Sequence, residues 1–320
     1  MAQDFMPAFF VLGAPKCGTT WLFAALERHT QIAMTSPKEC NVLSREIDFS
    51  GAGLDNPRRV CRDPDAIRVP NNWRDLYRKH LPETQAGQIV GDSSMSYNQP
   101  KIIRFILEQV PTAKFIFVMR DPVERLKSAR LHRMKTGEEI GDVDAAITAY
   151  QSGESAGGFL IEQGLYARKL ERIFEIVPRE NVLVLVMERM LANPTASQET
   201  LTRIFDFLGV ESCTPISLPQ NVNVARKPRS FLLAQLHRKL QTSVVLNRLR
   251  NMPLVEHSPL GWTIRKLRRW NRVAPGREDR ALTEDQIHQL SKIFAPDVER
   301  LERLLGDRFP EWRSVAAGPR

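Results

Sequence analysis

The segment 9-FFVLGAPKCGTTWLFAAL-26 joins an apolar run to a helical pattern through a short loop that contains two glycines. Residues 8–14 predict a buried strand, and residues 18–28 predict the helix into which that strand leads. The two glycines, Gly13 and Gly18, have the spacing GxxxxG. In such a loop the backbone N–H groups and the N-terminus of the following helix attract anions. The segment therefore predicts a phosphate-binding loop between a strand and a helix.

The lysine of this loop lies inside it and not at its end. In a Walker A loop the lysine follows the second glycine, but Thr19 holds that position here and the loop lysine is Lys16. A Walker B strand that ends in a magnesium-binding aspartate is also missing from the sequence, because Arg120 separates Asp121 from the apolar run before it. We therefore prefer phosphate binding without ATP hydrolysis, and we expect no metal site.

Composition narrows the class of protein. The chain has 320 residues, of which 42% are hydrophobic and 26% are charged, as in an ordinary globular protein. The sequence contains no apolar run of the roughly 18 residues that a membrane span requires. Its four cysteines lack the CxxC spacing of zinc sites. We therefore expect a cytoplasmic protein with reduced thiols and without a disulfide framework.

Apolar runs alternate with helical patterns as far as residue 220. The further strands are expected at 88–94, 113–120 and 181–190. The further helices are expected at 101–110, 122–135, 164–177 and 197–210. Continuous apolar strands that alternate with helices indicate a parallel sheet with helices on both faces. The sequence thus predicts a three-layer α/β sandwich with a central parallel sheet and a P-loop-like phosphate loop.

We assign the whole chain to one domain, with an α/β core at 1–220 and a basic helical C-terminal part at 221–320. Between Arg226 and Arg280 there are 14 lysines and arginines but only three acidic residues, so this segment has a net charge of +11. Because the whole chain has a net charge of +9, the remaining residues together carry about −2. The basic residues of this segment form either a helical face exposed to solvent or a surface that binds anions. Contact with a membrane surface is a further option, whereas no nucleic-acid-binding signature accompanies the charge.

Two motifs resemble those of the sulfotransferases that use 3′-phosphoadenosine 5′-phosphosulfate (PAPS). APKCGTTWL (14–22) resembles their 5′-phosphosulfate loop PKxGTT, in which the lysine holds the position of Lys16. FIFVMRDPVERLKSARLHR (115–133) resembles their second motif RDPxxRxxS, which binds the 3′-phosphate of the donor. TSPKECNVLS (35–44) and VGDSSMSYN (90–98) are similar to further segments of that family. The resemblance is strongest to bacterial and carbohydrate (heparan-type) members.

The resemblance implies an enzyme that moves a sulfuryl group from PAPS to a hydroxyl of a saccharide or another hydroxylated metabolite. The product of the donor would be adenosine 3′,5′-bisphosphate. Lys16 would stabilise the charge that develops on the leaving group. The residues that the resemblance assigns to the donor are Lys16, Cys17, Gly18, Thr19, Thr20, Trp21, Arg120, Ser128, Arg226, Lys227 and Arg229.

Two residues compete for the role of general base. Glu39 in SPKEC matches the glutamate of the carbohydrate branch, and His80 in RKHLP resembles the histidine of the cytosolic small-molecule branch. In the cytosolic branch that histidine shortly precedes the RD-type strand, whereas a strand and a helix intervene here. We therefore favour Glu39 and keep His80 as the alternative, beside a non-catalytic nucleotide- or polyanion-binding protein. The residues expected to face the acceptor are Lys38, Asp92, Ser94 and Tyr97.

Overall fold

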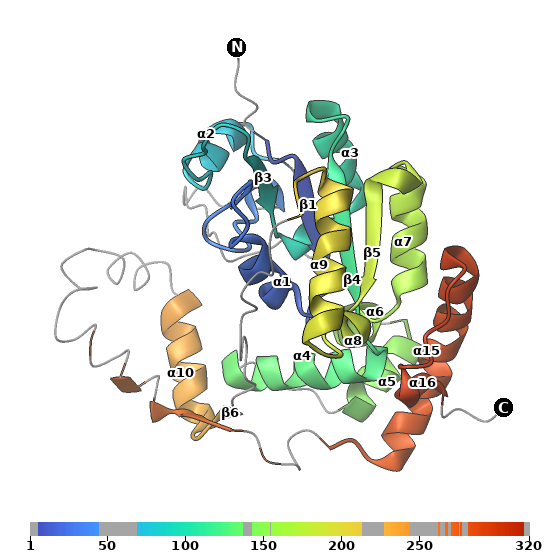
Figure 1. Cartoon of the computed structure of the whole chain (residues 1–320). Coiled ribbons are helices and arrows are strands. Elements are labelled where there is room, and N and C mark those ends of the chain that lie inside the picture. The colour runs from blue at the N-terminus through green and yellow to red at the C-terminus, as the bar shows by residue number, and fades with distance from the viewer. Residues whose placement is uncertain are drawn as a thin grey trace. The chain divides into compact units, whose positions relative to one another are not determined.

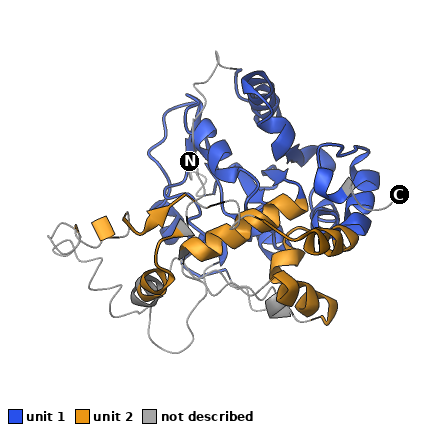
Figure 2. Ribbon diagram, turned by 90° about the horizontal axis from the view of Figure 1, so that it is seen from below, with its two compact units in different colours: residues 1–121, 165–223, 294–316 blue, residues 122–164, 224–293, 317–320 orange. Residues whose placement is uncertain are grey.

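The computed structural model describes most of the chain in two compact units. The described residues are 6–44, 69–136, 143–153, 155–212, 227–242, 262, 266–267, 270–274, 276 and 281–316. The first unit combines residues 1–121, 165–223 and 294–316, and the second combines 122–164, 224–293 and 317–320 (Figure 2). The boundary that we expected near residue 220 lies outside the described residues.

A five-stranded parallel sheet forms the centre of the first unit, in the order β2-β3-β1-β4-β5 (Figure 1). Its strands are β1 Phe9–Gly13, β2 Ile32–Met34, β3 Ile89–Asp92, β4 Lys114–Met119 and β5 Val182–Val186. In the middle of the sheet, Phe10 of β1 lies opposite Asp92 on one side and Phe115 on the other. Every residue of β1 is buried, which explains why its sequence is one continuous apolar run. The predicted α/β fold with a central parallel sheet is confirmed.

Helices cover both faces of this sheet. Helices α1 (Thr19–Leu26) and α9 (Pro194–Leu208) lie on one face, and α3 (Pro100–Gln109) and α7 (Tyr166–Phe174) lie on the other (Figure 1). Helix α9 shows why these segments are helical, because Asn193 caps its first turn and Gly209 ends it in a left-handed conformation. The shorter elements of the unit are η1 Val42–Ser44, α2 Trp73–Arg78, η2 Met95–Asn98, η3 Arg179–Asn181, α8 Met187–Met190 and α16 Arg313–Ala316.

The second unit is mainly helical. Its elements are α4 Pro122–Thr136, α5 Val143–Gln151, α6 Ser155–Glu162, β6 Lys227–Pro228, α10 Phe231–Thr242 and β7 Arg272–Val273, while α15 Glu284–Leu305 begins in this unit and ends in the first. The buried Arg125 of α4 donates a hydrogen bond to the carbonyl of Leu160 in α6. The side chain of Asn271 bonds both backbone groups of Ser230 and so fixes the start of α10 beside the antiparallel β6–β7 pair.

Helices α5 and α6 were not among the helices expected from the sequence, and two features of the strands also differ from the prediction. The strand expected at 181–190 ends at Val186, and Met187–Met190 forms the one-turn helix α8. The second difference is β2, which was not expected because three residues are too few to show a pattern. Within the described residues, no helix has both the length and the apolar character needed to cross a membrane.

Candidate active site

The loop after β1 has the backbone conformation that its glycine spacing suggests. Gly18 has a left-handed conformation, with φ 84°, and is the first cap residue of α1. Having no side chain, Gly18 cannot cap the helix itself, and the first N–H groups of α1 lie at the carboxyl edge of the sheet, where they favour an anion. Cys17 and Thr19 are buried on either side of Gly18. The residues of this loop therefore fit a bound phosphosulfate.

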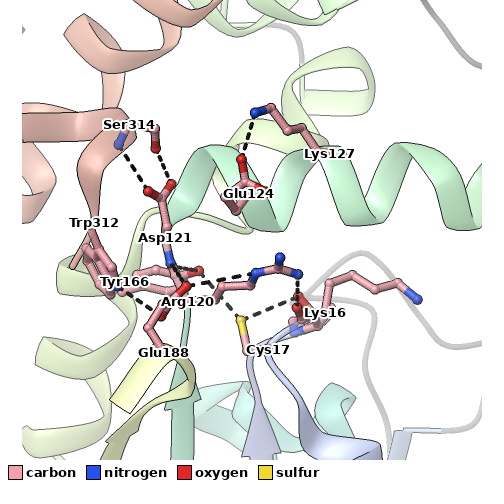
Figure 3. Close-up of polar contacts among 11 residues, drawn as sticks. Lys16, Cys17, Arg120, Asp121, Glu124, Lys127, Tyr166, Glu188, Trp312 and Ser314 are labelled. Carbon is pink, nitrogen blue, oxygen red and sulfur yellow. Dashed lines mark hydrogen bonds and ion pairs between the residues drawn. The ribbon is translucent and has the colours of Figure 1, made fainter. Parts of the chain in front are cut away.

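Arg120 follows β4 and meets the same loop. Its Nη1 donates a hydrogen bond of 3.4 Å to the carbonyl of Lys16 (Figure 3). The hydroxyl of Tyr166 donates to the carbonyl of Arg120 at 2.8 Å and lies 3.6 Å from the Sγ of Cys17. These contacts arise because β1 and β4 are parallel neighbours, whose carboxyl ends lie at the same edge of the sheet. The two sequence motifs, more than a hundred residues apart, thus come together at Lys16 and Arg120.

Lys38 connects the loop to the candidate base. Its ammonium group lies 2.9 Å from Oε1 of Glu39 and donates a hydrogen bond of 3.3 Å to the hydroxyl of Thr19. Lys38 and Glu39 are both partly buried. The ammonium group of Lys38 thus lies between the hydroxyl of Thr19, in the loop after β1, and the carboxylate of Glu39. The contact with Lys38 orients Oε1 of Glu39. A carboxylate has two acceptor oxygens, so Oε2 can still accept a proton or a hydrogen bond.

The backbone is strained at both predicted catalytic residues. Lys16 has φ 71° and Glu39 has φ 61°, and Asn41 is the third described residue other than glycine with a positive φ. The left-handed region costs such a residue roughly 1–2 kcal/mol. Strain of this kind persists only where the surroundings fix it, and it gathers at functional sites. The two positions chosen from sequence motifs are therefore also set apart by their backbone geometry.

The end of β3 fixes the strained segment that carries Glu39. The N–H of Glu39 donates to the carbonyl of Ser93 at 3.1 Å, and the N–H of Asn41 donates to the hydroxyl of Ser94 at 3.2 Å. Between them, the thiol of Cys40 donates to Oδ2 of Asp92 at 3.0 Å. Three consecutive residues are therefore attached to Asp92, the last residue of β3, and to the two residues that follow it.

Asp92 is fully buried and accepts two further hydrogen bonds, from the hydroxyls of Ser94 at 2.6 Å and Tyr77 at 2.9 Å. The phenol oxygens of Tyr77 and Tyr97 lie 3.1 Å apart. Burial raises the pKa of Asp92, and the hydrogen bonds from Ser94, Cys40 and Tyr77 oppose this rise. Asp92, Ser94 and Tyr97 were expected to face the acceptor. Since all three are buried and bonded within this cluster, we interpret them as the support of the Glu39 segment.

The alternative base, His80, has a different environment. It lies just beyond the end of α2, and its Nδ1 is 2.9 Å from the carbonyl of Ser36. The backbone groups of His80 are also bonded, the N–H to Tyr77 and the carbonyl to Ser36. These contacts agree with a histidine that ends a helix and holds the neighbouring loop. Its role as a base stays a prediction.

The remaining donor residues of the prediction lie in several places. Thr20 and the half-buried Trp21 form the first turn of α1. Ser128 lies in α4 of the second unit, where it is half-buried. In the same unit the guanidinium of Arg229 lies 5.4 Å from the ring centre of Trp270. Arg226 and the side chain of Lys227 lie outside the described residues.

Sequence reasoning missed the residues that surround the Arg120 end of the site, among them Glu188. Its Oε1 accepts a hydrogen bond of 3.0 Å from the N–H of Asp121, its Oε2 accepts one of 3.2 Å from the indole of Trp312, and the Nε of Arg120 is 3.9 Å away (Figure 3). Burial raises the pKa of Glu188, and these hydrogen bonds oppose the rise. The usable signal was an acidic residue directly after the apolar run of residues 182–187.

A family profile now adds to this geometry. The profile of the sulfotransferase family matches residues 7–215, well over half of the chain. The chain belongs to the sulfotransferase family. The membership in this family that the two motifs predicted is therefore confirmed. Among the described residues of this sulfotransferase-family chain, no group of three or more His, Cys, Asp and Glu side chains could hold a metal ion.

Individual members of the sulfotransferase family are distant in sequence. Carbohydrate sulfotransferase 15 of Mus musculus is 26% identical over 277 residues, which cover 70% of this chain and 47% of that protein. The bifunctional heparan sulfate N-deacetylase/N-sulfotransferase 2 of Mus musculus is 24% identical over 218 residues, which cover 65% of this chain and 22% of that protein. The chain thus spans about half or less of the length of these curated relatives.

A solved structure supports the same fold. The crystal structure of a sulfotransferase from Alicyclobacillus acidocaldarius matches 96% of this chain and 99% of its own, with a TM-score of 0.62 and 21% identity. The match extends over nearly the full length of both chains, so it concerns the whole fold.

Proposed function

We propose that this chain transfers a sulfuryl group from PAPS to a hydroxyl group of a saccharide or another hydroxylated metabolite. The observation that carries the proposal is the meeting of Lys16 and Arg120 at the carboxyl edge of the sheet, beside the uncapped N-terminus of α1. A phosphosulfate needs an anion-binding nest, and a separate dianionic phosphate needs an arginine. The loop after β1 can supply the nest, and Arg120 after the neighbouring strand β4 can supply the guanidinium.

Each end of the donor has its own set of residues. The backbone N–H groups at Gly18 and Thr19, with the hydroxyl of Thr20, would bind the 5′-phosphosulfate. The guanidinium of Arg120 would bind the 3′-phosphate, because its planar group of donors matches phosphate oxygens better than a lysine does.

The transfer step breaks the bond between sulfur and the bridging oxygen of the donor and forms a bond between sulfur and the acceptor oxygen. Negative charge develops on the bridging oxygen, where Lys16 would stabilise it. The acceptor hydroxyl loses its proton to the carboxylate of Glu39. Lys38 would orient this carboxylate through the contact of 2.9 Å, and its second contact, to Thr19, keeps the base next to the donor loop.

The relatives support a saccharide as the acceptor. The names of the two mouse proteins state action on carbohydrate and on heparan sulfate. The match to the family profile covers the segment of Lys38 and Glu39, whose resemblance to the carbohydrate branch led us to choose Glu39 as the base. A saccharide hydroxyl is also a weak acid, so its attack requires a base in contact with it.

Calorimetric titration tests the donor half of the proposal first. Adenosine 3′,5′-bisphosphate should bind the wild-type chain, 5′-AMP and ATP–Mg should bind more weakly, and Arg120→Ala should weaken only the bisphosphate. Turnover of PAPS with a panel of saccharides then tests the acceptor half, with Lys16→Ala and Glu39→Gln as inactive controls. Preferential binding of ATP–Mg would contradict the proposal, and so would a folded protein that binds no nucleotide.

A further inference from the structure

The peptide group between Arg120 and Asp121 is held at both of its polar atoms. Its carbonyl oxygen accepts the hydrogen bond of 2.8 Å from Tyr166, and its N–H donates the bond of 3.0 Å to Glu188 (Figure 3). The two partners come from different elements, since Tyr166 begins α7 and Glu188 lies in α8. Hydrogen bonds on both sides restrain the rotation of this peptide group, and they therefore restrain the direction in which the Arg120 side chain leaves the backbone.

The chain's C-terminal segment holds the same point. Asp121 is buried, and its carboxylate accepts hydrogen bonds from the N–H of Ser314, at 3.2 Å, and from the Ser314 hydroxyl. The indole of the buried Trp312 donates to Glu188 at 3.2 Å, and its ring lies 5.8 Å from the ring of Tyr166. Trp312, about 190 positions beyond Arg120, therefore contacts both residues that restrain the Arg120 backbone: it donates a hydrogen bond to Glu188, and its ring packs beside that of Tyr166.

Helix α8 also contacts the phosphosulfate loop. A Cβ atom added at Gly18 would lie 3.2 Å from Cε of Met190 and 3.4 Å from Cγ of Met187. The two methionines flank Glu188 on one helical turn. One short helix thus contacts the loop after β1 through its methionines and the end of β4 through its carboxylate.

We propose that Glu188, Tyr166, Trp312 and Ser314 are positioning residues that hold Arg120 in the direction needed to bind the 3′-phosphate. The inference rests on the proposed function and adds residues to its donor site. It assigns the segment around Trp312 and Ser314 to that site, although none of these residues needs to touch the donor.

Charge and position predict opposite effects at Glu188, which makes the inference testable. A carboxylate 3.9 Å from the Nε of Arg120 lowers the positive potential there. By charge alone, removing it would strengthen the binding of a phosphate dianion. If position dominates, removing it leaves the N–H of Asp121 or the indole of Trp312 without its acceptor and weakens binding.

The experiment measures the dissociation constant of adenosine 3′,5′-bisphosphate for Glu188→Gln, Tyr166→Phe and Trp312→Phe. We expect Glu188→Gln to weaken binding about tenfold. The two phenylalanine variants, each of which keeps an aromatic ring but loses the polar group, should weaken it about threefold to tenfold. The control is Arg78→Gln on helix α2 of the same unit. Its guanidinium pairs with Asp75 in an exposed ion pair, away from the residues that hold Arg120, so affinity should change less than about twofold.

Steady-state kinetics separates positioning from general destabilisation. In the variants that fold, KM for PAPS should rise with little change in kcat, because the 3′-phosphate is remote from the transferred group. Tighter or unchanged binding by Glu188→Gln would overturn the inference, and if that variant does not fold, unchanged binding by Tyr166→Phe and Trp312→Phe would do so. A wild-type chain that does not bind the bisphosphate would instead reject the proposed function itself, and the inference with it.

Discussion

Replacing Gly18 by alanine tests whether the backbone of the loop creates the donor site. An alanine at φ 84° costs roughly 1–2 kcal/mol, because its Cβ approaches the following carbonyl. The new Cβ would also lie 3.2 Å from Cε of Met190. That atom ends a flexible side chain and can move by a few tenths of an ångström, so we expect strain to exceed crowding.

The expected result is a loss of about 1–2 kcal/mol in the free energy of unfolding, or a fall in Tm of about 2–8 °C. Thermal unfolding measures this loss. If the variant relieves its strain by rotating the loop, the N–H groups of the donor site turn away. Titration with adenosine 3′,5′-bisphosphate should then show binding that is about tenfold weaker, which corresponds to about 1.4 kcal/mol.

Gly209→Ala is the matched control. Gly209 has nearly the same conformation, with φ 77°, but a Cβ there would meet only the Nζ of Lys114 at 4.0 Å. The control should lose the same stability and bind the bisphosphate normally. The reasoning is refuted if Gly18→Ala binds the bisphosphate as tightly as the wild type. A stability loss more than about 2 kcal/mol beyond that of Gly209→Ala would show that crowding at the methionines, and not strain, dominates.

Three further predictions concern the base and its support. Glu39→Gln should lower kcat by about 100-fold or more with bisphosphate affinity retained, while His80→Asn should change kcat only a few-fold; the opposite order would make His80 the base. Lys38→Met should lower kcat by about tenfold through loss of the contact to Glu39, and an unchanged kcat would exclude this orienting role. Because burial raises the pKa of Asp92, the folded chain binds more protons there than the unfolded chain, so stability should fall as pH rises from about 4 through the folded pKa. Asp92→Asn should flatten that slope in thermal unfolding, and an unaltered slope would contradict it.

The part of the site that the sequence predicts is the part encoded locally. The strand, loop and helix around Gly18 are adjacent in the chain, so one short motif contains both the anion-binding backbone and the lysine. Parallel pairing of β1 with β4 then brings Arg120 to Lys16, as the order of the two motifs suggests. Each of these steps depends on strand ends, which apolar runs mark clearly.

The part that the sequence does not predict depends on pairs distant in the chain. Glu188 belongs to a segment that reads as the end of a strand, and its partner Trp312 follows 124 residues later. Asp92 shows the converse case, because a polar residue at the end of a strand suggests an exposed site. Tyr77 and Cys40, from α2 and from the Glu39 segment, cover it instead. No local pattern distinguishes a buried carboxylate from an exposed one.

The buried thiol of Cys40 has a practical consequence. Burial and the neighbouring carboxylate raise the pKa of Cys40, and alkylating reagents attack only the thiolate. In the native protein Cys40 should react only when the strained segment next to it opens. The rate of its alkylation, followed by mass spectrometry of the peptide, therefore reports the opening of the Glu39 segment in the unsubstituted protein. A bound donor that slows this rate would reveal how strongly the two halves of the site are coupled.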